Sequence, residues 1–294
     1  MIERVAVIGA GTMGNGIAHS LALGGFSVTL IDAAKEGLAR GIEAIDANLR
    51  AGVERGKLSA DEARAARARI STGLDIKAAA AAQLVIEAVP EDLGLKYSVF
   101  HELEDVCTAE TIFATNTSAL SITEIAAAVK DPARVIGMHY FNPAHIMKLV
   151  EVVRGLETSE RAVEVATEVA SRSGKETVLI NESPGFITTR INALIGNEAF
   201  YMLQEGVASA HDIDRALKLG LNHPMGPFEM VDLVGLDTRL KILQHLHATL
   251  GEKFRPCPLL VKFVNAGRLG RKSGRGVYDY PNDAASLKAS KAAR

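Results

Sequence analysis

The sequence has no marked excess of charge and no long apolar run. Its 294 residues contain 33 Lys and Arg and 35 Asp and Glu, which give a formal net charge of −2. No overall electrostatic field therefore attracts nucleic acid, and any anionic ligand must be held by local groups. No apolar run approaches the roughly 18 residues that a membrane-spanning helix needs. We expect no nucleic-acid partner and no membrane partner.

Cysteine is also scarce. Cys107 and Cys257 are the two cysteines of the chain, and they form no metal-binding or redox spacing. Their scarcity predicts no metal site and suits a reducing compartment. An apolar β-type run begins at residue 5, which leaves no room for a signal peptide before it. We therefore expect the protein to lie in the cytoplasm.

The composition is typical of a globular protein with a substantial core. A hydrophobic share of 48% over this length suggests two domains. The first half alternates short β-branched runs with helical patterns, as an α/β fold requires. The strands that we predict cover residues 5–8, 28–31, 84–89, 112–115, 135–139, 149–153 and 177–180.

A long helical pattern interrupts this alternation after the second predicted strand. Residues 36–69 are charged and helical with a glycine-containing break in the middle, and Ser59 and Glu62 form a capping box that starts a second helix. The pattern predicts a helical hairpin that projects from the sheet. The other predicted helices of this half begin near Ser121 and span residues 159–173.

The character of the sequence changes near residue 184. Beyond it the strand signal nearly vanishes and long helical patterns dominate, so we place a domain boundary between residues 1–183 and 184–294. The second domain is predicted to be all-α. Residues from Pro281 onward are rich in Ala, Lys and Ser, and we expect them to fray.

A glycine-rich segment directly follows the first predicted strand. Gly9 allows the tight turn out of the strand, Gly11 lets the backbone approach a pyrophosphate, and Gly14 lets the next helix pack closely on the sheet. Thr12 and Met13 open that helix, whose N-terminal N–H groups and dipole attract phosphates. The order of these features predicts a Rossmann-type doubly wound sheet that binds a dinucleotide.

The second predicted strand is followed by an acidic residue. Asp32 stands where a carboxylate can accept a hydrogen bond from a ribose 2′-hydroxyl, and the same charge would repel a 2′-phosphate. No Arg follows it immediately, and we interpret Lys35 as a solvated side chain. The pattern therefore favours NAD over NADP as the cofactor.

A histidine ends the predicted strand at residues 135–139. His139 lies on the side of an open α/β sheet where ligands bind, and histidine titrates near neutral pH, as a general base must. Glu151 lies on the next predicted strand. A strand–loop–strand return would bring it opposite His139, where a carboxylate stabilises a cationic ring. A structural histidine at the strand end is the alternative interpretation.

Several further motifs follow one another along the chain. Besides the glycine-rich loop and Asp32, they are Glu87-Ala-Val-Pro-Glu91-Asp-Leu-Gly-Leu-Lys96, Asn116-Thr-Ser118, Gly137-Met-His139-Tyr-Phe-Asn142-Pro143, His223-Pro-Met-Gly-Pro-Phe-Glu229 and Gly270-Arg-Lys272-Ser-Gly274. In this order they resemble the L-3-hydroxyacyl-CoA dehydrogenase family, particularly its bacterial 3-hydroxybutyryl-CoA members. The resemblance runs from residue 5 to about residue 280, nearly the full chain.

The resemblance implies NAD-dependent oxidation of a short-chain L-3-hydroxyacyl-CoA to the 3-ketoacyl-CoA, or the reverse reaction. It makes His139 the catalytic base, Glu151 the acid that orients it, and Ser118 a residue beside the substrate oxygen and the nicotinamide. Further residues that it implies contact the dinucleotide are Glu91, Lys96, Asn142 and Lys272. Each has a plainer structural interpretation, such as a turn cap for Ser118 or a helix-surface pair for Glu91 and Lys96.

Two positions depart from the family pattern. Many members carry an Asn near the substrate carbonyl where this chain has Thr189, whose hydroxyl has a shorter reach. Asn192, near the same helix face, is a candidate substitute. His145 stands where an apolar residue is common, and we expect it to be exposed on the surface.

The phosphates of CoA need cations that the overall charge does not supply. The predicted hairpin offers Arg50, Arg55 and Lys57 close together, and in the resembling family this element contacts CoA. Charge-assisted hydrogen bonds from such groups are about twice as strong as neutral ones. A solvated helix face is the alternative for each residue. Arg50 is the first candidate.

Two other functions remain open from the sequence. One is a dehydrogenase of a related hydroxy acid without CoA, and the other is a non-catalytic NAD-binding protein, because a fold guarantees no activity. The resemblance also implies that the helical domain contacts substrate and forms a homodimer. The apolar stretches at residues 191–203 and 230–240 are consistent with such an interface and equally with a core.

Overall fold

The computed structural model describes residues 1–280 and divides the protein into two compact units. The first unit is Met1–Ser183, and the second begins at Pro184. The fraying expected from Pro281 onward lies outside the described residues. Within residues 1–280, no helix is long and apolar enough to cross a membrane.

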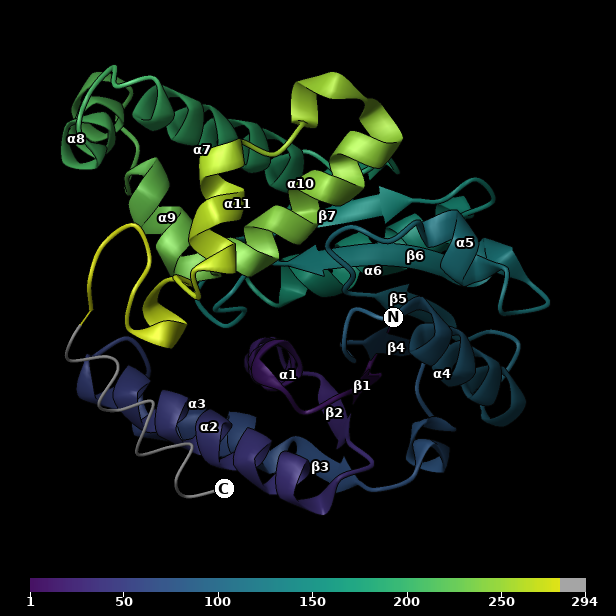
Figure 1. Ribbon diagram of the computed structural model, residues 1–294. Helices are drawn as coiled ribbons and strands as arrows, with labels where there is room; N and C mark the ends of the chain where they lie inside the picture. The colour runs from purple at the N-terminus through teal and green to yellow at the C-terminus, as the bar shows by residue number, and fades with distance from the viewer. Residues whose placement is uncertain (281–294) are drawn as a thin grey trace. The chain divides into compact units, whose positions relative to one another are not determined.

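The first unit is built on an eight-stranded sheet in the order β3-β2-β1-β4-β5-β6-β7-β8 (Figure 1). Its strands are β1 Arg4–Ile8, β2 Ser27–Ile31, β3 Ile70–Gly73, β4 Leu84–Glu87, β5 Ile112–Thr115, β6 Val135–Tyr140, β7 Leu149–Arg154 and β8 Glu176–Asn181. Neighbouring strands are parallel except β6 and β7, which are antiparallel. The chain order reverses around β1, which lies between β2 and β4, and ligands bind at such a point. The predicted Rossmann-type sheet is confirmed.

The central strands of this sheet are buried along their length. Every residue of β4, β5 and β6 is buried, and in β1 only Arg4 is exposed. Strands covered on both faces read as continuous apolar runs, which is why the sequence identifies them. Strand β3 is not among the predicted strands, because it lies at the edge and buries only Ile70 of its four residues.

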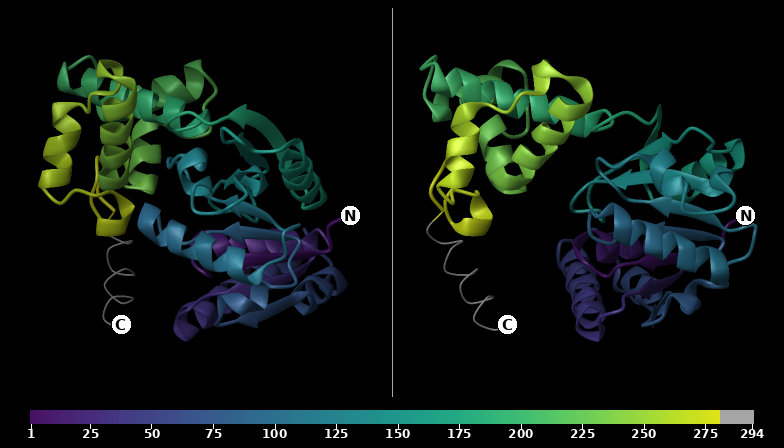
Figure 2. Two further views of the ribbon diagram at one scale, coloured as in Figure 1. Left: turned by 90° about the vertical axis from the view of Figure 1, so that its right-hand side faces the viewer. Right: turned by 45° about the vertical axis from the view of Figure 1, so that its right-hand side comes forward.

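Helices cover both faces of the sheet (Figure 2). They are α1 Thr12–Leu23, α2 Lys35–Glu54, α3 Ala60–Ala68, α4 Leu93–Val106, α5 Ile122–Ala126 and α6 Glu160–Arg172, with short 3₁₀ turns at Ile76–Ala79 and Pro132–Arg134. Helices α1 and α6 share a core cluster with Val7 and Ile86 of the sheet. On the other face, Phe100 of α4 meets Phe113 of β5 edge to face, with ring centroids 6.0 Å apart.

Helices α2 and α3 form the predicted hairpin. Ser59 and Glu62 make the predicted capping box at the start of α3, since each accepts a hydrogen bond from the backbone N–H of the other. The hairpin does not simply project from the sheet. Ile45 and Ala66 pack into the same core cluster as Ile17 of α1, so the two inserted helices lie against the helix that follows the glycine-rich loop.

The second unit consists of helices and loops in its described part, residues 184–280. Its helices are α7 Thr188–Gln204, α8 Ala210–Gly220, α9 Pro227–Val234, α10 Leu236–Leu250 and α11 Pro258–Asn265, with 3₁₀ turns at Glu252–Phe254 and Arg271–Ser273. Phe200 of α7 makes edge-to-face contacts with Phe228 of α9 and Phe263 of α11, at centroid distances of 5.2 and 5.9 Å. These rings form the centre of an all-α core, as predicted.

Two buried aspartates hold the end of the described chain against the helices of the second unit. Asp214 of α8 accepts hydrogen bonds from the N–H of Phe228 and the hydroxyl of Tyr278, both at 2.8 Å. Asp232 of α9 accepts from the N–H groups of Val277 and Tyr278, at 2.8 and 2.9 Å. The final loop is therefore fixed by charge-assisted hydrogen bonds rather than by apolar packing alone.

Candidate active site

Two glycines of the glycine-rich loop, Gly9 and Gly14, stand where a side chain would clash with the backbone, whereas Gly11 has open space around it. Gly9 follows β1 with a φ of +96°, and a Cβ at this position would lie 2.7 Å from the carbonyl oxygen of Ala88. A Cβ on Gly14 would lie 1.7 Å from the carbonyl oxygen of Gly9. Helix α1 can therefore begin at Thr12 close to the end of the strand, with its first N–H groups facing outward for an anion.

Asp32 is fixed at the carboxyl end of β2 by backbone hydrogen bonds. Its Oδ2 accepts the N–H of Ala10 at 2.8 Å, and its Oδ1 accepts the N–H of Ala34 at 2.9 Å. The first of these bonds ties the carboxylate to the glycine-rich loop. Asp32 is only partly buried and lines a cavity next to that loop. A ribose bound there would meet an oriented hydrogen-bond acceptor.

Two adjoining cavities lie along the carboxyl edge of the sheet in the first unit. The larger one, about 860 Å³, is lined by the glycine-rich loop, Asp32 and apolar side chains that include Ile76, Leu95 and Val99. The smaller one, about 350 Å³, is lined by Glu91, Asn116, Ser118, His139 and Asn142 among others. Both share Met13, Ala88 and Val89. Polar residues make up a larger share of the lining in the smaller cavity, which we call the polar end, and the two cavities in succession suit an extended dinucleotide.

His139 and Glu151 meet at the polar end. Strands β6 and β7 are antiparallel, and their register places the two residues directly opposite each other. Nδ1 of His139 is 2.7 Å from Oε2 of Glu151. Their side chains are 8% and 1% exposed. The ring of Phe141 lies 4.5 Å from that of His139 and covers part of it.

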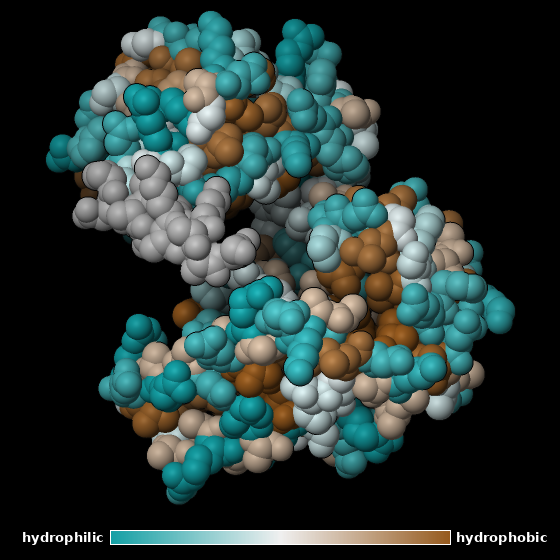
Figure 3. Space-filling view, turned by 60° about the horizontal axis from the view of Figure 1, so that its bottom comes forward, coloured by the Kyte–Doolittle hydropathy of each residue, from teal (hydrophilic) through white to brown (hydrophobic). Residues whose placement is uncertain are grey.

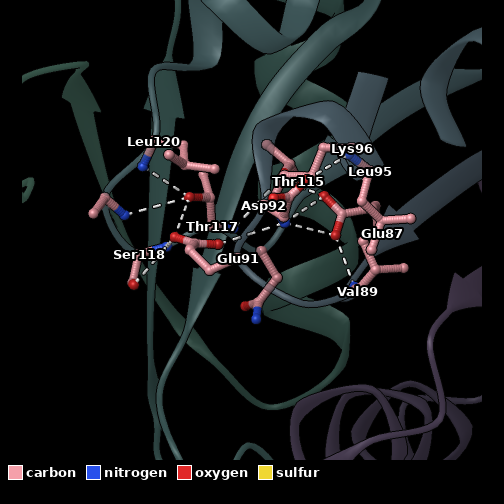
Figure 4. A network of polar contacts seen from close by, with 12 residues as sticks. Glu87, Val89, Glu91, Asp92, Leu95, Lys96, Thr115, Thr117, Ser118 and Leu120 are labelled. Carbon is pink, nitrogen blue, oxygen red and sulfur yellow. Dashed lines mark hydrogen bonds and ion pairs between the residues drawn. The ribbon is translucent and has the colours of Figure 1, made fainter. Parts of the chain in front are cut away.

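Ser118 lies in the loop that follows β5. Its N–H and its hydroxyl both donate to Oε1 of Glu91, at 3.0 and 3.4 Å, and the hydroxyl of Thr117 donates to the same oxygen at 2.6 Å (Figure 4). The side chain of Asn116 in the same loop accepts the N–H of Tyr140 on β6 at 2.9 Å. The loop is therefore attached both to the turn after β4 and to the strand that carries the histidine.

Two family models match this chain. The 3-hydroxyacyl-CoA dehydrogenase NAD binding domain matches residues 4–183, and the 3-hydroxyacyl-CoA dehydrogenase C-terminal domain matches residues 185–280. The chain belongs to the 3-hydroxyacyl-CoA dehydrogenase family. The match of the first model, together with the fit of the cavities, indicates NAD as the cofactor.

Similar proteins of this family cover nearly the whole chain. A probable 3-hydroxybutyryl-CoA dehydrogenase of Bacillus subtilis is 46% identical over 95% of this chain and 98% of its own length. A 3-hydroxyadipyl-CoA dehydrogenase of Escherichia coli is 45% identical over 95% of this chain and 59% of its own length. The crystal structure of (S)-3-hydroxybutyryl-CoA dehydrogenase from Ralstonia eutropha, 39% identical, superimposes with a TM-score of 0.93 and covers 95% of this chain and 99% of that one.

In this member of the family, the segment after β6 is held by α1 and by Lys175. The carbonyl of Ala144 accepts hydrogen bonds from the hydroxyl of Ser20 at 3.1 Å and from the ammonium of Lys175 at 2.6 Å. The expectation that His145 is exposed is wrong. It is half-buried, because its ring stacks on that of His19 with centroids 5.0 Å apart and planes 8° apart.

His19 is a buried titratable group that sequence reasoning missed. It is 2% exposed, and within residues 1–280 neither of its ring nitrogens has a hydrogen-bond partner. Burial lowers its pKa to about 4, and the positive charges that His145 and Lys175 can carry act in the same direction. The available signal is its position in a mostly apolar stretch of α1, residues 16–22, which is buried throughout.

The three candidate CoA-binding cations cluster at the far end of α2. Arg50 lies in the last turns of α2, Arg55 caps its end, and Lys57 follows in the connection to α3; all three are exposed. Arg50 also lines a groove with Asp46 and Arg67, which form an ion pair with each other at 2.7 Å. The structure thus brings the three cations onto one exposed end of the hairpin.

The remaining predicted site residues lie in the second unit. Thr189 is in the first turn of α7, and Oδ1 of Asn192 accepts a hydrogen bond from the guanidinium of Arg239 at 2.9 Å. Arg239 is 2% exposed, and burial lowers its pKa to about 10. The oxygen of Asn192 therefore serves this buried cation. Lys272 pairs with Asp237 at 2.5 Å.

The structure also identifies a residue that the sequence analysis did not single out. Glu87, at the end of β4, is fully buried and contacts the ammonium of Lys96, whose side chain is 1% exposed (Figure 4). Glu87 begins one of the motifs quoted above and ends an apolar strand. Nothing in the sequence indicates that its side chain pairs with Lys96. The same ammonium is 3.5 Å from Glu91. Lys96 is thus a buried bridge between two carboxylates.

Proposed function

We propose that the protein interconverts a short-chain L-3-hydroxyacyl-CoA and the corresponding 3-ketoacyl-CoA with NAD as the hydride carrier. The observation that carries this proposal is the His139–Glu151 pair at the polar end of the dinucleotide cavities. A buried imidazole oriented by a carboxylate is the arrangement that accepts a proton from a hydroxyl group and returns it to a carbonyl oxygen. Membership of the 3-hydroxyacyl-CoA dehydrogenase family supports the same reaction.

In the oxidative direction, His139 takes the proton of the 3-hydroxyl group. Because Nδ1 faces Glu151, the proton goes to Nε2, and the Glu151 carboxylate stabilises the resulting imidazolium. A bound NAD would supply the acceptor for the hydride of C3, so that the carbinol is oxidised to the carbonyl. Ser118 would turn its hydroxyl from Glu91, 3.4 Å away, to this oxygen and donate a hydrogen bond to it as the carbon–oxygen bond gains double-bond character; the N–H of Ser118 stays on Glu91. The reductive direction runs through the same groups in reverse.

Most of the residues that we assign to the dinucleotide belong to the first unit. The N–H groups at the start of α1, which opens with Thr12 and Met13, bind the pyrophosphate, and Asp32 accepts from the adenosine ribose. Further contacts are assigned to Glu91, Lys96, Asn142 and Lys272. For Lys96 the burial of its side chain supports an indirect contribution through Glu91.

The CoA part of the substrate is assigned to cations of the α2–α3 hairpin. Arg50, Arg55 and Lys57 are exposed there and meet the need for local positive charge in a chain of net charge −2. Thr189 and the amide of Asn192 are candidates for contacts near the acyl carbonyl. The names of the B. subtilis and R. eutropha relatives favour a 3-hydroxybutyryl group, while the E. coli relative is named for a longer dicarboxylic one.

Assembly and location are further parts of the proposal. Several large apolar residues of the second unit are exposed, among them Ile191, Leu219, Leu221 and Leu233, which supports a homodimer formed through this unit. Hydrophobic residues also stand among hydrophilic ones on the face shown in Figure 3. The two cysteines are free thiols, as suits a cytoplasmic enzyme of fatty acid metabolism.

A substrate comparison tests this function. The purified protein is mixed with NADH and acetoacetyl-CoA, and loss of NADH is followed; the same is done with free acetoacetate. CoA-dependent loss of NADH supports the proposal. Loss with free acids alone would assign the protein to hydroxy acids without CoA, and no loss with either substrate would favour a non-catalytic NAD-binding role. Replacing NADH by NADPH tests the cofactor choice.

A further inference from the structure

A buried ion pair lies beneath the loop that carries Ser118. The ammonium of Lys96 is 2.7 and 2.9 Å from the two carboxylate oxygens of Glu87. The side chains are 1% and 0% exposed. Taking two charges out of water costs several kcal/mol per ion, so a buried pair gives little net stability compared with apolar side chains of similar size. Stability is therefore a weak reason for this pair.

The carboxylate of Glu87 connects three elements of the site. One oxygen also accepts the N–H of Val89 at 2.7 Å, in the turn after β4. The other accepts the hydroxyl of Thr115 at 2.7 Å, at the end of β5. Together with Lys96 on α4, these contacts fix the relative positions of two strand ends and a helix (Figure 4), next to Val89, which lines both cavities.

The second carboxylate near Lys96 is the one that holds Ser118. Oε2 of Glu91 is 3.5 Å from the Lys96 ammonium, farther than either oxygen of Glu87. Its other oxygen accepts the N–H and the hydroxyl of Ser118 and the hydroxyl of Thr117. Because Glu87 satisfies most of the charge of Lys96, Glu91 can turn its Oε1 to the Ser118 loop.

We propose that Glu87 is a positioning residue for hydride transfer, acting through Lys96 and Glu91 on Ser118. It neutralises Lys96 and anchors the ends of β4 and β5, and so keeps Glu91 in place beneath the serine that faces the substrate oxygen. This role rests on the proposed function of Ser118. Positioning of Ser118 accounts for the buried Glu87–Lys96 pair, which a small contribution to stability does not explain.

The test is the substitution Glu87→Gln. Glutamine keeps the size of the side chain and one acceptor oxygen but carries no charge. Of the two carboxylates that contact Lys96, only Glu91 then remains to balance its positive charge. We expect Glu91 to move toward Lys96 and release Ser118. The expected result is a fall in kcat of about 10- to 100-fold, with the KM for acetoacetyl-CoA little changed. We also expect the dissociation constant of NADH, measured by fluorescence titration, to rise about threefold, a loss of about 0.7 kcal/mol.

Glu104→Gln is the matched control. Glu104 lies on the same helix α4, its side chain is 9% exposed, and it pairs with Arg134 at 3.4 Å, away from the Ser118 loop. This variant also loses a poorly exposed carboxylate from an ion pair. We expect it to lower the thermal midpoint while leaving kcat and NADH affinity unchanged. Equal losses of kcat in the two variants would make Glu87 merely structural and would overturn the proposal.

A double-mutant cycle with Ser118→Ala separates positioning from general damage. If Glu87 acts through Ser118, the double variant loses about as much kcat as the more impaired single variant. Additive losses would contradict the proposal. The NADH titration keeps the inference testable should the wild-type protein fail to reduce acetoacetyl-CoA. In that case the proposed function fails, while unchanged NADH affinity in Glu87→Gln would independently overturn the role of Glu87.

Discussion

His139 and Glu151 occupy directly opposed positions on the antiparallel strands β6 and β7, with the ring Nδ1 2.7 Å from the carboxylate Oε2. Both residues are buried, so water competes little for the bond between them. The carboxylate fixes which ring nitrogen carries the proton in the neutral form and stabilises the ring when it is cationic. This geometry is the one that the proposed proton transfer at His139 requires.

Replacing His139 by Gln tests the role of the ring. Glutamine preserves a polar side chain of moderate size but cannot accept a proton at neutral pH. We expect kcat to fall by about 10²- to 10⁴-fold, the range typical of a general base, while the dissociation constant of NADH stays within about twofold of wild type. His211→Gln, at an exposed position of the second unit, is the control. Unchanged turnover in His139→Gln would remove this residue from the catalytic role.

Replacing Glu151 by Gln tests the charge rather than the orientation. The amide oxygen of glutamine can still accept the hydrogen bond from Nδ1, but it does not stabilise an imidazolium. We expect kcat to fall by about 10²-fold, and the pH at which oxidation reaches half its maximal rate to change. The measurement is kcat for acetoacetyl-CoA reduction and 3-hydroxybutyryl-CoA oxidation over a range of pH. A variant with wild-type rate and pH profile would show that Glu151 only fills space.

The inner strands of the first unit could be predicted because they are buried on both faces. Their apolar runs end at candidate site residues, so Asp32 and His139 can be assigned to the carboxyl edge of the sheet without coordinates. The register between β6 and β7 could not be derived in the same way. Glu151 faces His139 because β7 runs antiparallel to β6 with these two residues paired. A shift of one residue in that register would turn Glu151 to the other face of the sheet.

Other contacts are tertiary and leave no periodic signal. Glu87 and Lys96 lie within one motif, yet their pairing depends on how α4 packs against the end of β4. The stacking of His19 on His145 joins α1 to the segment after β6, far apart in the sequence. A histidine within a mostly apolar helix segment predicts at most that its ring is buried. The residue on which the ring stacks becomes known only from the fold.

The carboxylate of Asp32 is expected to favour NADH over NADPH, and its substitution should weaken that preference. Its carboxylate is oriented by the N–H groups of Ala10 and Ala34 and would repel a ribose 2′-phosphate. In Asp32→Asn we expect the ratio of kcat/KM for NADH to that for NADPH to fall about tenfold, equivalent to about 1.4 kcal/mol. Asp75→Asn, which removes a charge from the same cavity, should leave the ratio unchanged. An unaltered ratio in Asp32→Asn would show that other groups select the cofactor.

The buried His19 predicts how stability changes with pH. Burial holds its pKa in the folded protein at about 4, below the ordinary value of 6.5. Between these values the unfolded chain binds a proton that the folded protein does not. The free energy of unfolding therefore falls as the pH is lowered from about 6.5 toward 4, by about 3 kcal/mol in all from this group. Above pH 6.5 the residue is neutral in both states and has no such effect.

The slope of stability against pH is the quantity that tests this account. In His19→Gln we expect a flatter decline of the free energy of unfolding between pH 6.5 and 4, measured by denaturant titration at several pH values. If the new side chain packs less well, it lowers the free energy of unfolding by the same amount at every pH. The slope is then unaltered, and the two proteins can still be compared. His211→Gln removes an exposed histidine and should leave the slope as it is. If the stability of His19→Gln declines as steeply as that of wild type, acid destabilisation arises from other groups, because the ring of His19 can change the slope only by taking up a proton.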